Sequence, residues 1–232
     1  MHLWNVNVIL LKQSKIKKGY NMEAYIQVND LNLTINKNVV LENINFSLEK
    51  GKCLGLAGMN GCGKTMIMKC VSGLILPTSG EIFVDGRKIG VDIDFPESLG
   101  IMIEVPGFIP FFFFFENLKS LAKIKNIIDD NTIKQWLDKV GLDSKDKRKV
   151  RKYSLGMRQR LAIAQALMEN PDLYILDEPF NGLDIKGVGE VRTILNDLKN
   201  NGKTIILSSH NPQDLEFLCD KIIRLDAGRI IE

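Results

Sequence analysis

One stretch of the chain combines residue types and a spacing that suit phosphate chemistry. Residues 58–65 are G-M-N-G-C-G-K-T, which fits the G-x-x-x-x-G-K-[ST] pattern of a phosphate-binding loop. The glycines let successive backbone N–H groups point at one anion, and a following helix adds the partial positive charge of its N-terminus. Lys64 would then lie near the β- and γ-phosphates of a nucleotide, and the Thr65 hydroxyl would be a ligand of Mg²⁺.

The residues on either side supply the strand and the helix that such a loop needs. Residues 53–57 are an apolar run typical of a buried strand, and residues 66–72 have the pattern of a helix. A chance glycine-rich turn would not explain why the glycines, the lysine and the threonine all match in this context. The predicted nucleotide-binding residues of the loop are Gly58, Met59, Asn60, Gly61, Cys62, Gly63, Lys64, Thr65 and Met66.

A second stretch ends in two carboxylates. Residues 173–176 are the apolar run L-Y-I-L, and Asp177 and Glu178 follow directly. An acid at the end of a buried strand can reach the Mg²⁺ held by Thr65, directly or through water, and the next acid can polarise a water that attacks the γ-phosphate. Acids are also common where a strand meets solvent, so the catalytic interpretation of this stretch depends on the phosphate loop upstream.

Composition sets bounds on the class of protein. The chain has 232 residues, of which 45% are hydrophobic and 25% charged, as in an ordinary globular protein with one large domain or two lobes around a shared core. The net charge of +3 is too small to indicate a nucleic-acid partner, and we expect none. Four cysteines without C-x-x-C spacing favour a reducing cytosol over a zinc site or disulfides. Work at a membrane would need another chain, because no apolar run is long enough to span one.

Hydrophobic periodicity predicts the α/β fold class. Residues 25–28, 31–35 and 39–48 favour antiparallel strands, and alternating strands and helices in the second half favour a parallel sheet with helical crossovers. We therefore expect a phosphate-loop core with a parallel sheet, an N-terminal antiparallel β-subdomain and a helical insert near residues 112–155. Further strands are expected at residues 81–84, 100–103, 173–176, 204–208 and 222–225, and helices at 132–140, 155–168, 186–200 and 212–218.

Residues 1–21 differ from the rest of the chain. An apolar run precedes the basic residues, which is the reverse of the order in a signal peptide. Our hypothesis is that Met22 is the natural start and that residues 1–21 are a translated leader, with residues 22–232 as the folded domain. The alternative is a genuine amphipathic anchor.

Five consecutive phenylalanines, residues 111–115, follow Ile109 and Pro110. Five such side chains cannot all face one core, whether on a helix or on a strand. One interpretation is a buried strand covered on both faces. We favour an exposed patch that binds a partner, because Pro110 and the following Glu116 place the run at a junction between loop and helix.

The order of the motifs resembles that of the ATP-binding subunit of ABC transporters. The phosphate loop comes first, and residues 153–160, Y-S-L-G-M-R-Q-R, are similar to the L-S-G-G-Q signature of that family. The strand that ends in Asp177 and Glu178 follows. Residues 181–184, N-G-L-D, resemble the loop at the seam of the dimer, and His210 resembles the switch histidine. The resemblance covers the chain from Tyr25 to its end.

The resemblance implies a mechanism and partners. It implies ATP and Mg²⁺ as ligands, with Glu178 orienting the attacking water and His210 contacting the γ-phosphate. A second ATP-binding subunit, identical or different, would pair head-to-tail, so that Ser154 and Gly156 contact ATP on the partner and Asp184 lies at the seam. A separate transmembrane permease would be contacted through residues 104–115. The chain would then be cytoplasmic and peripheral on the inner face of the cell membrane.

Three positions depart from the family pattern. Leu155 and Met157 replace the commonest signature residues Gly and Gln. Glu104 stands where a glutamine is usual, and as an acid it could contact Mg²⁺ or its water. Ile35 aligns with the aromatic residue that usually stacks on adenine, so selectivity for adenine over guanine is expected to be loose.

Two short stretches, I-E-V-P-G-F and Y-S-L-G-M-R-Q-R, resemble the ATPases of bacitracin and lantibiotic-immunity exporters. The expected function is ATP hydrolysis that powers export of a peptide antibiotic, a lantibiotic or another hydrophobic compound. The alternatives are a soluble ABC-type ATPase acting on a macromolecule and the ATPase of an importer. A small-molecule kinase would leave Ser154 and Gly156 unexplained, and a non-catalytic subunit would leave Glu178 unexplained.

Overall fold

The computed structural model describes residues 24–104 and 107–231, so the hypothesis about residues 1–21 lies outside the described residues. In chain order the elements are β1 (Ala24–Ile35), β2 (Asn38–Glu49), β3 (Cys53–Ala57), α2 (Lys64–Val71), β4 (Ser79–Val84), β5 (Arg87–Lys88), β6 (Leu99–Met102), α3 (Phe114–Lys125), α4 (Asp130–Lys139), the 3-10 helix η1 (Val150–Lys152), α5 (Leu155–Leu167), β7 (Leu173–Leu176), α6 (Ile185–Asn200), β8 (Thr204–Ser208), α7 (Pro212–Leu218), β9 (Lys221–Asp226) and β10 (Arg229–Ile230).

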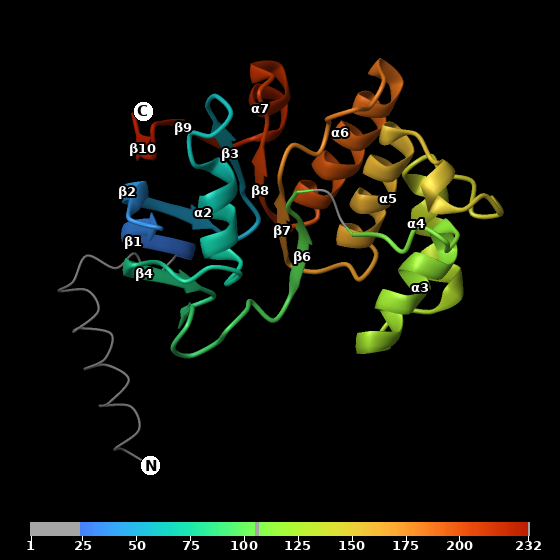
Figure 1. Ribbon diagram of the computed structural model, residues 1–232, viewed down its shortest axis with the longest axis horizontal. Coiled ribbons are helices and arrows are strands. Elements are labelled where there is room, and N and C mark those ends of the chain that lie inside the picture. The colour runs from blue at the N-terminus through green and yellow to red at the C-terminus, as the bar shows by residue number, and fades with distance from the viewer. Residues whose placement is uncertain (1–23, 105–106, 232) are drawn as a thin grey trace, which may run out of the picture.

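Two sheets organise these elements (Figure 1). The first is antiparallel, with strand order β2-β1-β4-β5. The second has the order β10-β9-β3-β8-β7-β6, and its strands are parallel except for the terminal β10. The carboxyl ends of parallel strands lie at one edge of a sheet, where ligands of such folds bind. The α/β class predicted from the sequence is confirmed.

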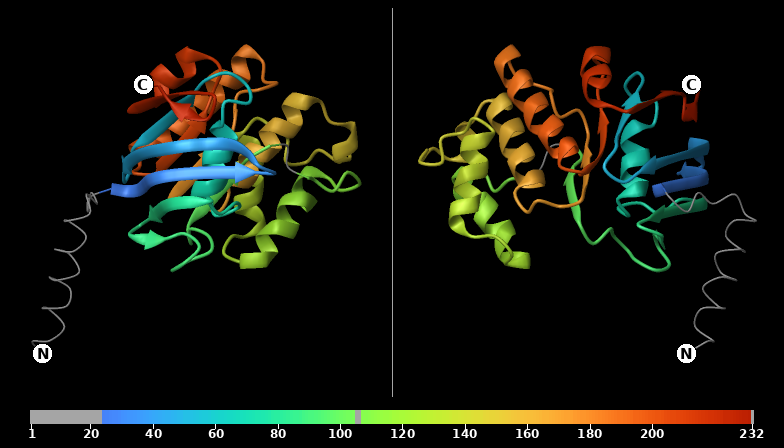
Figure 2. Two further views of the ribbon diagram at one scale, coloured as in Figure 1. Left: turned by 60° about the vertical axis from the view of Figure 1, so that its left-hand side comes forward. Right: turned by 180° about the vertical axis from the view of Figure 1, so that it is seen from behind.

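The parallel sheet is covered on both faces. All four residues of β7 are buried, and they alternate between two hydrophobic cores. Leu173 and Ile175 pack in the core shared with α2 and the antiparallel sheet, whereas Tyr174 and Leu176 pack in the core shared with α5 and α6. Helix α2 therefore lies between the two sheets, and α3 and α4 extend the second core away from them (Figures 1 and 2). None of the helices in the described part of the chain is long and apolar enough to cross a membrane.

Two sequence-based boundaries were wrong. Residues 25–28 and 31–35 belong to one strand, β1, because the chain continues through a bulge at Asp30, which has a φ of 47°. Helix α2 begins at Lys64 and not at Met66, so the last two residues of the phosphate-loop motif form the first helical turn. The first error arises because polar residues interrupt the apolar pattern of β1 without ending the strand, and the second because two polar residues, Lys64 and Thr65, open α2 before its first apolar residue.

The phenylalanine run is divided between surface and core. Phe111 and Phe112 are exposed, whereas Phe114 opens α3, is buried and stacks on Tyr153 with ring centres 3.7 Å apart. The interpretation of the run as a buried strand is wrong. The junction between loop and helix is confirmed, and the exposed patch comprises only the first part of the run.

Candidate functional site

The loop between β3 and α2 forms an open cradle of backbone N–H groups. Gly63 caps α2 with a φ of 111°, and no side chain accepts a hydrogen bond from the first helical turn. A Cβ atom at Gly58, where φ is 143°, would lie 2.4 Å from the carbonyl oxygen of Leu225, so glycine is required there. The uncapped N–H groups and the dipole of α2 make this loop suitable for an anion.

Lys64 is buried within this loop. Its Nζ donates hydrogen bonds to the carbonyl oxygens of Gly58 at 2.6 Å and Met59 at 3.2 Å, and lies 4.0 Å from Glu178 Oε1. The side chain is only 6% exposed. A buried ammonium bound to two carbonyl oxygens keeps its charge beside the cradle, where a phosphate would gain most from it.

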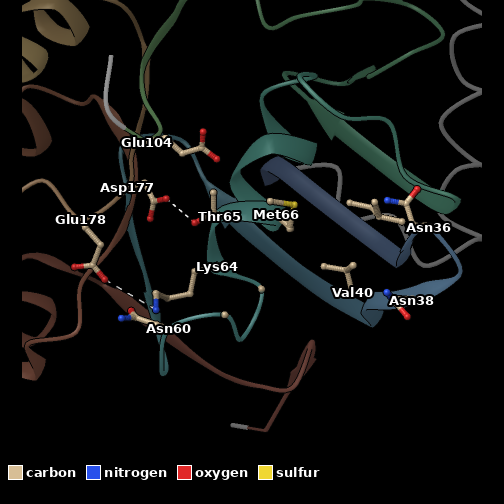
Figure 3. A pocket seen from close by; sticks show the side chains of 13 residues that line it. Asn36, Asn38, Val40, Asn60, Lys64, Thr65, Met66, Glu104, Asp177 and Glu178 are labelled. Atoms are coloured by element: carbon tan, nitrogen blue, oxygen red, sulfur yellow. Dashed lines mark hydrogen bonds and ion pairs between the residues drawn. The ribbon is translucent and has the colours of Figure 1, made fainter. Parts of the chain in front are cut away.

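A hydrogen-bonded chain joins the phosphate loop to the ends of two parallel strands. The Thr65 hydroxyl donates to Asp177 Oδ2 at 2.6 Å (Figure 3), and the Ser208 hydroxyl donates to Asp177 Oδ1 at 2.6 Å. The Ser208 oxygen also accepts from the N–H of Glu178 at 2.8 Å. Ser208 was missed by the sequence reasoning, although its place at the end of a strand parallel to residues 173–176 was a usable signal.

Glu178 is held at its backbone and at one carboxylate oxygen. Its φ of 50° is unusual for a residue other than glycine, and Gln159 Nε2 donates to its carbonyl oxygen at 2.9 Å. Oε2 lies 2.9 Å from His210 Nδ1 and also accepts from the backbone N–H of His210. Oε1 is buried and has no hydrogen-bond partner among the described residues. This oxygen is available to a ligand or a water. Gln159 was not predicted, since nothing in the sequence links it to Glu178.

A cavity of about 590 Å³ lies over the phosphate loop. The residues predicted for the site that line it are Asn60, Gly61, Gly63, Lys64, Thr65, Met66, Glu104, Asp177 and Glu178. Ile35 and Val40 line it as well, together with Asn36 in the turn after β1 and Asn38 at the start of β2. Figure 3 shows Asn36, Asn38 and Val40 on the far side of Met66 from Asp177. The cavity thus has a polar end with a lysine and two acids and a less polar end at the antiparallel sheet.

Glu104 lies at the rim of the cavity. It is 63% exposed, forms a salt bridge with Lys69 of α2 and has a φ of 60°. Its carboxylate therefore lies on the same side as Asp177 but is not part of the hydrogen-bonded chain through Thr65 (Figure 3). The oxygen donors near Thr65 suit Mg²⁺, which prefers one or two protein oxygens together with substrate phosphates. No group of three or more His, Cys, Asp or Glu side chains suited to a metal ion occurs in the described residues.

The other predicted residues do not line this cavity; they are Gly58, Met59, Cys62, Ser154, Gly156, Asp184 and His210. Gly58, Met59 and His210 line a neighbouring cavity of about 320 Å³, and Cys62 is buried behind the loop. Ser154 and Asp184 are exposed and begin α5 and α6, where their side chains accept from Met157 N and Gly187 N respectively.

Gly156 joins the signature to the loop before α6. A Cβ atom at this position would lie 2.7 Å from the carbonyl oxygen of Gly182. The signature and residues 181–184 therefore form one surface, which is separate from the cavity lining.

Comparisons with known proteins agree with this geometry. The family profile described as ABC transporter matches residues 41–181. The ABC transporter ATP-binding protein YybJ of Bacillus subtilis is 47% identical over 88% of this chain and 94% of its own. The bacitracin transport ATP-binding protein BcrA of Enterococcus faecalis is 41% identical over 91% of this chain and 69% of its own. The lantibiotic transport ATP-binding protein SrtF of Streptococcus pyogenes is 40% identical over 89% of both.

Solved structures show the same fold. An ATP-binding subunit of an ABC transporter is 27% identical and superposes with a TM-score of 0.81 over 90% of this chain and 88% of its own. The dimeric ABC transporter cassette MJ0796 has a TM-score of 0.81 at 24% identity, over 89% of this chain and 97% of its own.

Proposed function

This chain belongs to the ABC transporter family as an ATP-binding and ATP-hydrolysing subunit, and on that premise we propose that it powers the export of a peptide antibiotic or a similar hydrophobic compound through a separate permease. The observation that carries the proposal is the convergence of Lys64, Thr65, Asp177 and Glu178 on one cavity. The names of the relatives BcrA and SrtF supply the class of transported compound.

The roles of the residues follow from their positions. Lys64 and the N–H groups of the loop bind the β- and γ-phosphates of ATP, and the cavity extends to Ile35 at the base end. The Thr65 hydroxyl and Asp177 would hold Mg²⁺, which would supply positive charge to the phosphates, and Glu104, which also lines the cavity, would be a further ligand of the ion or of its water.

Glu178 is the proposed general base. Its Oε1, which has no hydrogen-bond partner among the described residues, accepts a hydrogen bond from the attacking water. It takes the proton as the water oxygen bonds to the γ-phosphorus and the bond from that phosphorus to the β,γ-bridging oxygen breaks, which releases ADP. His210 orients the carboxylate of Glu178 through Oε2. When the γ-phosphate is in place, His210 donates a hydrogen bond to that phosphate. The hydrogen bonds to the Glu178 backbone from Gln159 and to Ser208 restrict where the base can move.

The exposed signature supports a head-to-tail pair. Ser154 and Gly156 lie outside the cavity of their own chain, so the proposal assigns them, with Asp184, to the ATP bound by a second subunit. The first turn of α5, which Ser154 caps by accepting from Met157 N, would meet the γ-phosphate of the partner with the positive end of the helix dipole. The two subunits could be identical or different.

Complementation tests this arrangement. Lys64→Ala removes the phosphate lysine. Ser154→Arg blocks the signature, and because Ser154 is exposed it should cost only the helix cap at Met157 N, about 1 kcal/mol. Each variant alone should lose ATPase activity, whereas a mixture should regain part of it, since one composite site of a mixed dimer keeps both normal halves. A mixture that stays inactive, while both variants remain folded and form mixed dimers, would contradict head-to-tail pairing.

The permease is proposed to contact residues 104–115, in line with a cytoplasmic position on the inner face of the membrane. Ile109, Phe111 and Phe112 present exposed apolar surface there. Deleting the gene in its native host should increase susceptibility to bacitracin or a lantibiotic, and the wild-type gene should restore resistance where Glu178→Gln does not. Unchanged susceptibility to both compounds, with ATPase activity intact, would contradict the proposed export.

A further inference from the structure

A basic segment lies beside the exposed part of the phenylalanine run. Residues 145–152 contain six basic side chains and one carboxylate, Asp146, a net charge of +5 in a chain whose total is only +3. The basic residues of the segment are all exposed; they are Lys145, Lys147, Arg148, Lys149, Arg151 and Lys152. The small charge of the whole chain therefore conceals one concentrated basic surface.

Backbone hydrogen bonds join this segment to the apolar loop before α3. The N–H of Val150 donates to the carbonyl oxygen of Phe112 at 2.9 Å, and the N–H of Arg151 donates to that of Pro110 at 3.0 Å. The guanidinium of Arg151 lies 5.3 Å from the centre of the Phe111 ring. The two loops thus form one surface, at the end of the molecule that carries α3 and α4 (Figure 2).

The apolar area of this surface and four of its six basic side chains are unused within the described part of the chain. Ile109 is 43% exposed, Phe111 58% and Phe112 36%. Asp146 is paired with Arg148. No described carboxylate lies within ion-pair distance of the segment's four lysines, which are Lys145, Lys147, Lys149 and Lys152.

We infer that this basic–aromatic surface, formed by residues 109–112 and 145–152, binds the anionic headgroups of a phospholipid membrane. Lysine and arginine side chains around a small apolar tip match a bilayer surface, where the charges meet the phosphates and the apolar groups enter the boundary with the acyl chains. Each basic residue near an anionic bilayer raises partitioning by about fivefold.

A nucleic acid fits the surface less well. Bases bind to such surfaces by stacking on exposed ring faces. Arg151 already lies over the Phe111 ring, and Ile109 and Pro110 offer no aromatic face, so Phe112, which is 36% exposed, is the single ring that residues 109–112 leave for stacking. The lipid contact belongs to the chain before it binds a permease, whose proposed contact shares Ile109, Phe111 and Phe112. It goes beyond that coupling, because a bilayer without any other protein should be sufficient to bind the chain.

Vesicles provide the test. The full-length chain is sedimented with vesicles of phosphatidylcholine, alone or mixed with phosphatidylglycerol, over a range of salt concentrations. We expect binding only to the mixed vesicles and weaker binding as salt rises, because salt screens exposed charges. The triple variant Lys145→Glu, Lys147→Glu and Lys149→Glu should reduce binding by at least about tenfold.

A matched control changes the same charge elsewhere. Lys50→Glu, Lys186→Glu and Lys221→Glu alter exposed lysines next to β2, on α6 and on β9, and should leave vesicle binding close to that of the wild type. Every protein compared keeps residues 1–21, so a difference between the two triple variants reports the basic surface alone. Phe111→Ser with Phe112→Ser should also weaken binding while the melting temperature stays unchanged.

The possible outcomes separate the explanations. Equal vesicle binding by both triple variants, or no binding by the wild type, would overturn the inference. Binding to a single-stranded oligonucleotide is measured on the same proteins. If the triple variant of the basic segment loses oligonucleotide binding but binds vesicles like the wild type, the surface is assigned to a nucleic acid instead. ATPase activity measured in solution should be the same in the triple variants and the wild type, so failure of the lipid inference can be distinguished from failure of the proposed function.

Discussion

In the phosphate-loop half of the molecule the polar side chains of the site are hydrogen-bonded to one another, whereas in the helical half the signature serine faces outward. Thr65, Asp177 and Ser208 form one hydrogen-bonded chain at the edge of the parallel sheet. Ser154, the cap of α5, is exposed, and within the described residues its side chain bonds only to its own helix. An enclosed set of groups suits a small ligand, since burial strengthens each polar contact, while exposed groups suit a macromolecular partner.

The helical half itself contains both buried and exposed side chains next to each other in the sequence. Phe114 contributes to the core with Tyr153, and the neighbouring Phe111 does not. Sequence proximity therefore says little about role here, and each side chain has to be assigned by the direction in which it points.

The largest expected effect lies in the enclosed half. Glu178→Gln should lower the ATPase turnover number by about 10²–10⁴-fold, because an amide cannot accept the proton of the attacking water. ATP binding should remain, and size-exclusion chromatography with ATP should show an accumulated dimer. Glu49→Gln, the same chemical change at the exposed end of β2 and outside both cavities, is the control and should turn over normally. Near wild-type activity of Glu178→Gln would remove Glu178 as the base.

Truncating single phenylalanines of the helical half should distinguish core positions from surface positions by the loss in free energy of unfolding. Phe114→Ala should lower the free energy of unfolding by about 3–5 kcal/mol, because it removes a buried ring from a packed core. Phe111→Ala should change it by less than about 0.5 kcal/mol. Urea denaturation of the two variants measures both values. A combined change of residues 112–114 would mix the two effects and could not test the surface alone. Similar losses for both variants would contradict the division of the run.

A smaller effect is expected at the base end of the cavity. Ile35→Tyr should raise ATP affinity by roughly two- to tenfold and increase the preference for ATP over GTP, because a ring can stack on adenine where isoleucine makes only apolar contact. Val39→Tyr, at an exposed position outside the cavity lining, is the matched control. Competition binding with both nucleotides measures the change. If the two variants behave alike, Ile35 does not contact the base.

The smallest effect is a difference in thiol reactivity. Cys62 is 6% exposed and lies in the loop, whereas Cys53 and Cys70 are fully buried and burial raises the pKa of Cys70 to about 12. Maleimide should therefore label Cys62 faster than Cys53 and Cys70, and bound ATP should slow that labelling. Peptide mapping with and without ATP gives the rates, and the partly exposed Cys219 serves as a reference that ATP should not affect. Equal labelling of Cys62 with and without ATP would contradict its protection.

Features that depend on consecutive residues were predictable from the sequence. The phosphate loop and the two acids at the end of a strand are contiguous motifs, and residues 173–176 and 204–208 coincide with β7 and β8. The helix expected at residues 212–218 coincides with α7, which has Pro212 in its first turn. The spacing of apolar residues and the positions of glycine and proline act over a few residues, so they determine helices, strands and motifs locally.

Features that depend on contact between distant segments required the tertiary structure. Ser208 bonds to Asp177 across 31 positions of sequence, and Gln159 bonds to Glu178 across 19. The inward turn of Phe114 and the contact of residues 110–112 with the basic segment depend on how α3 and η1 pack. The sequence determined which groups the chain carries. Packing and the parallel register of the strands decided which groups meet, because hydrogen bonds and hydrophobic burial act through space and have no fixed spacing along the chain.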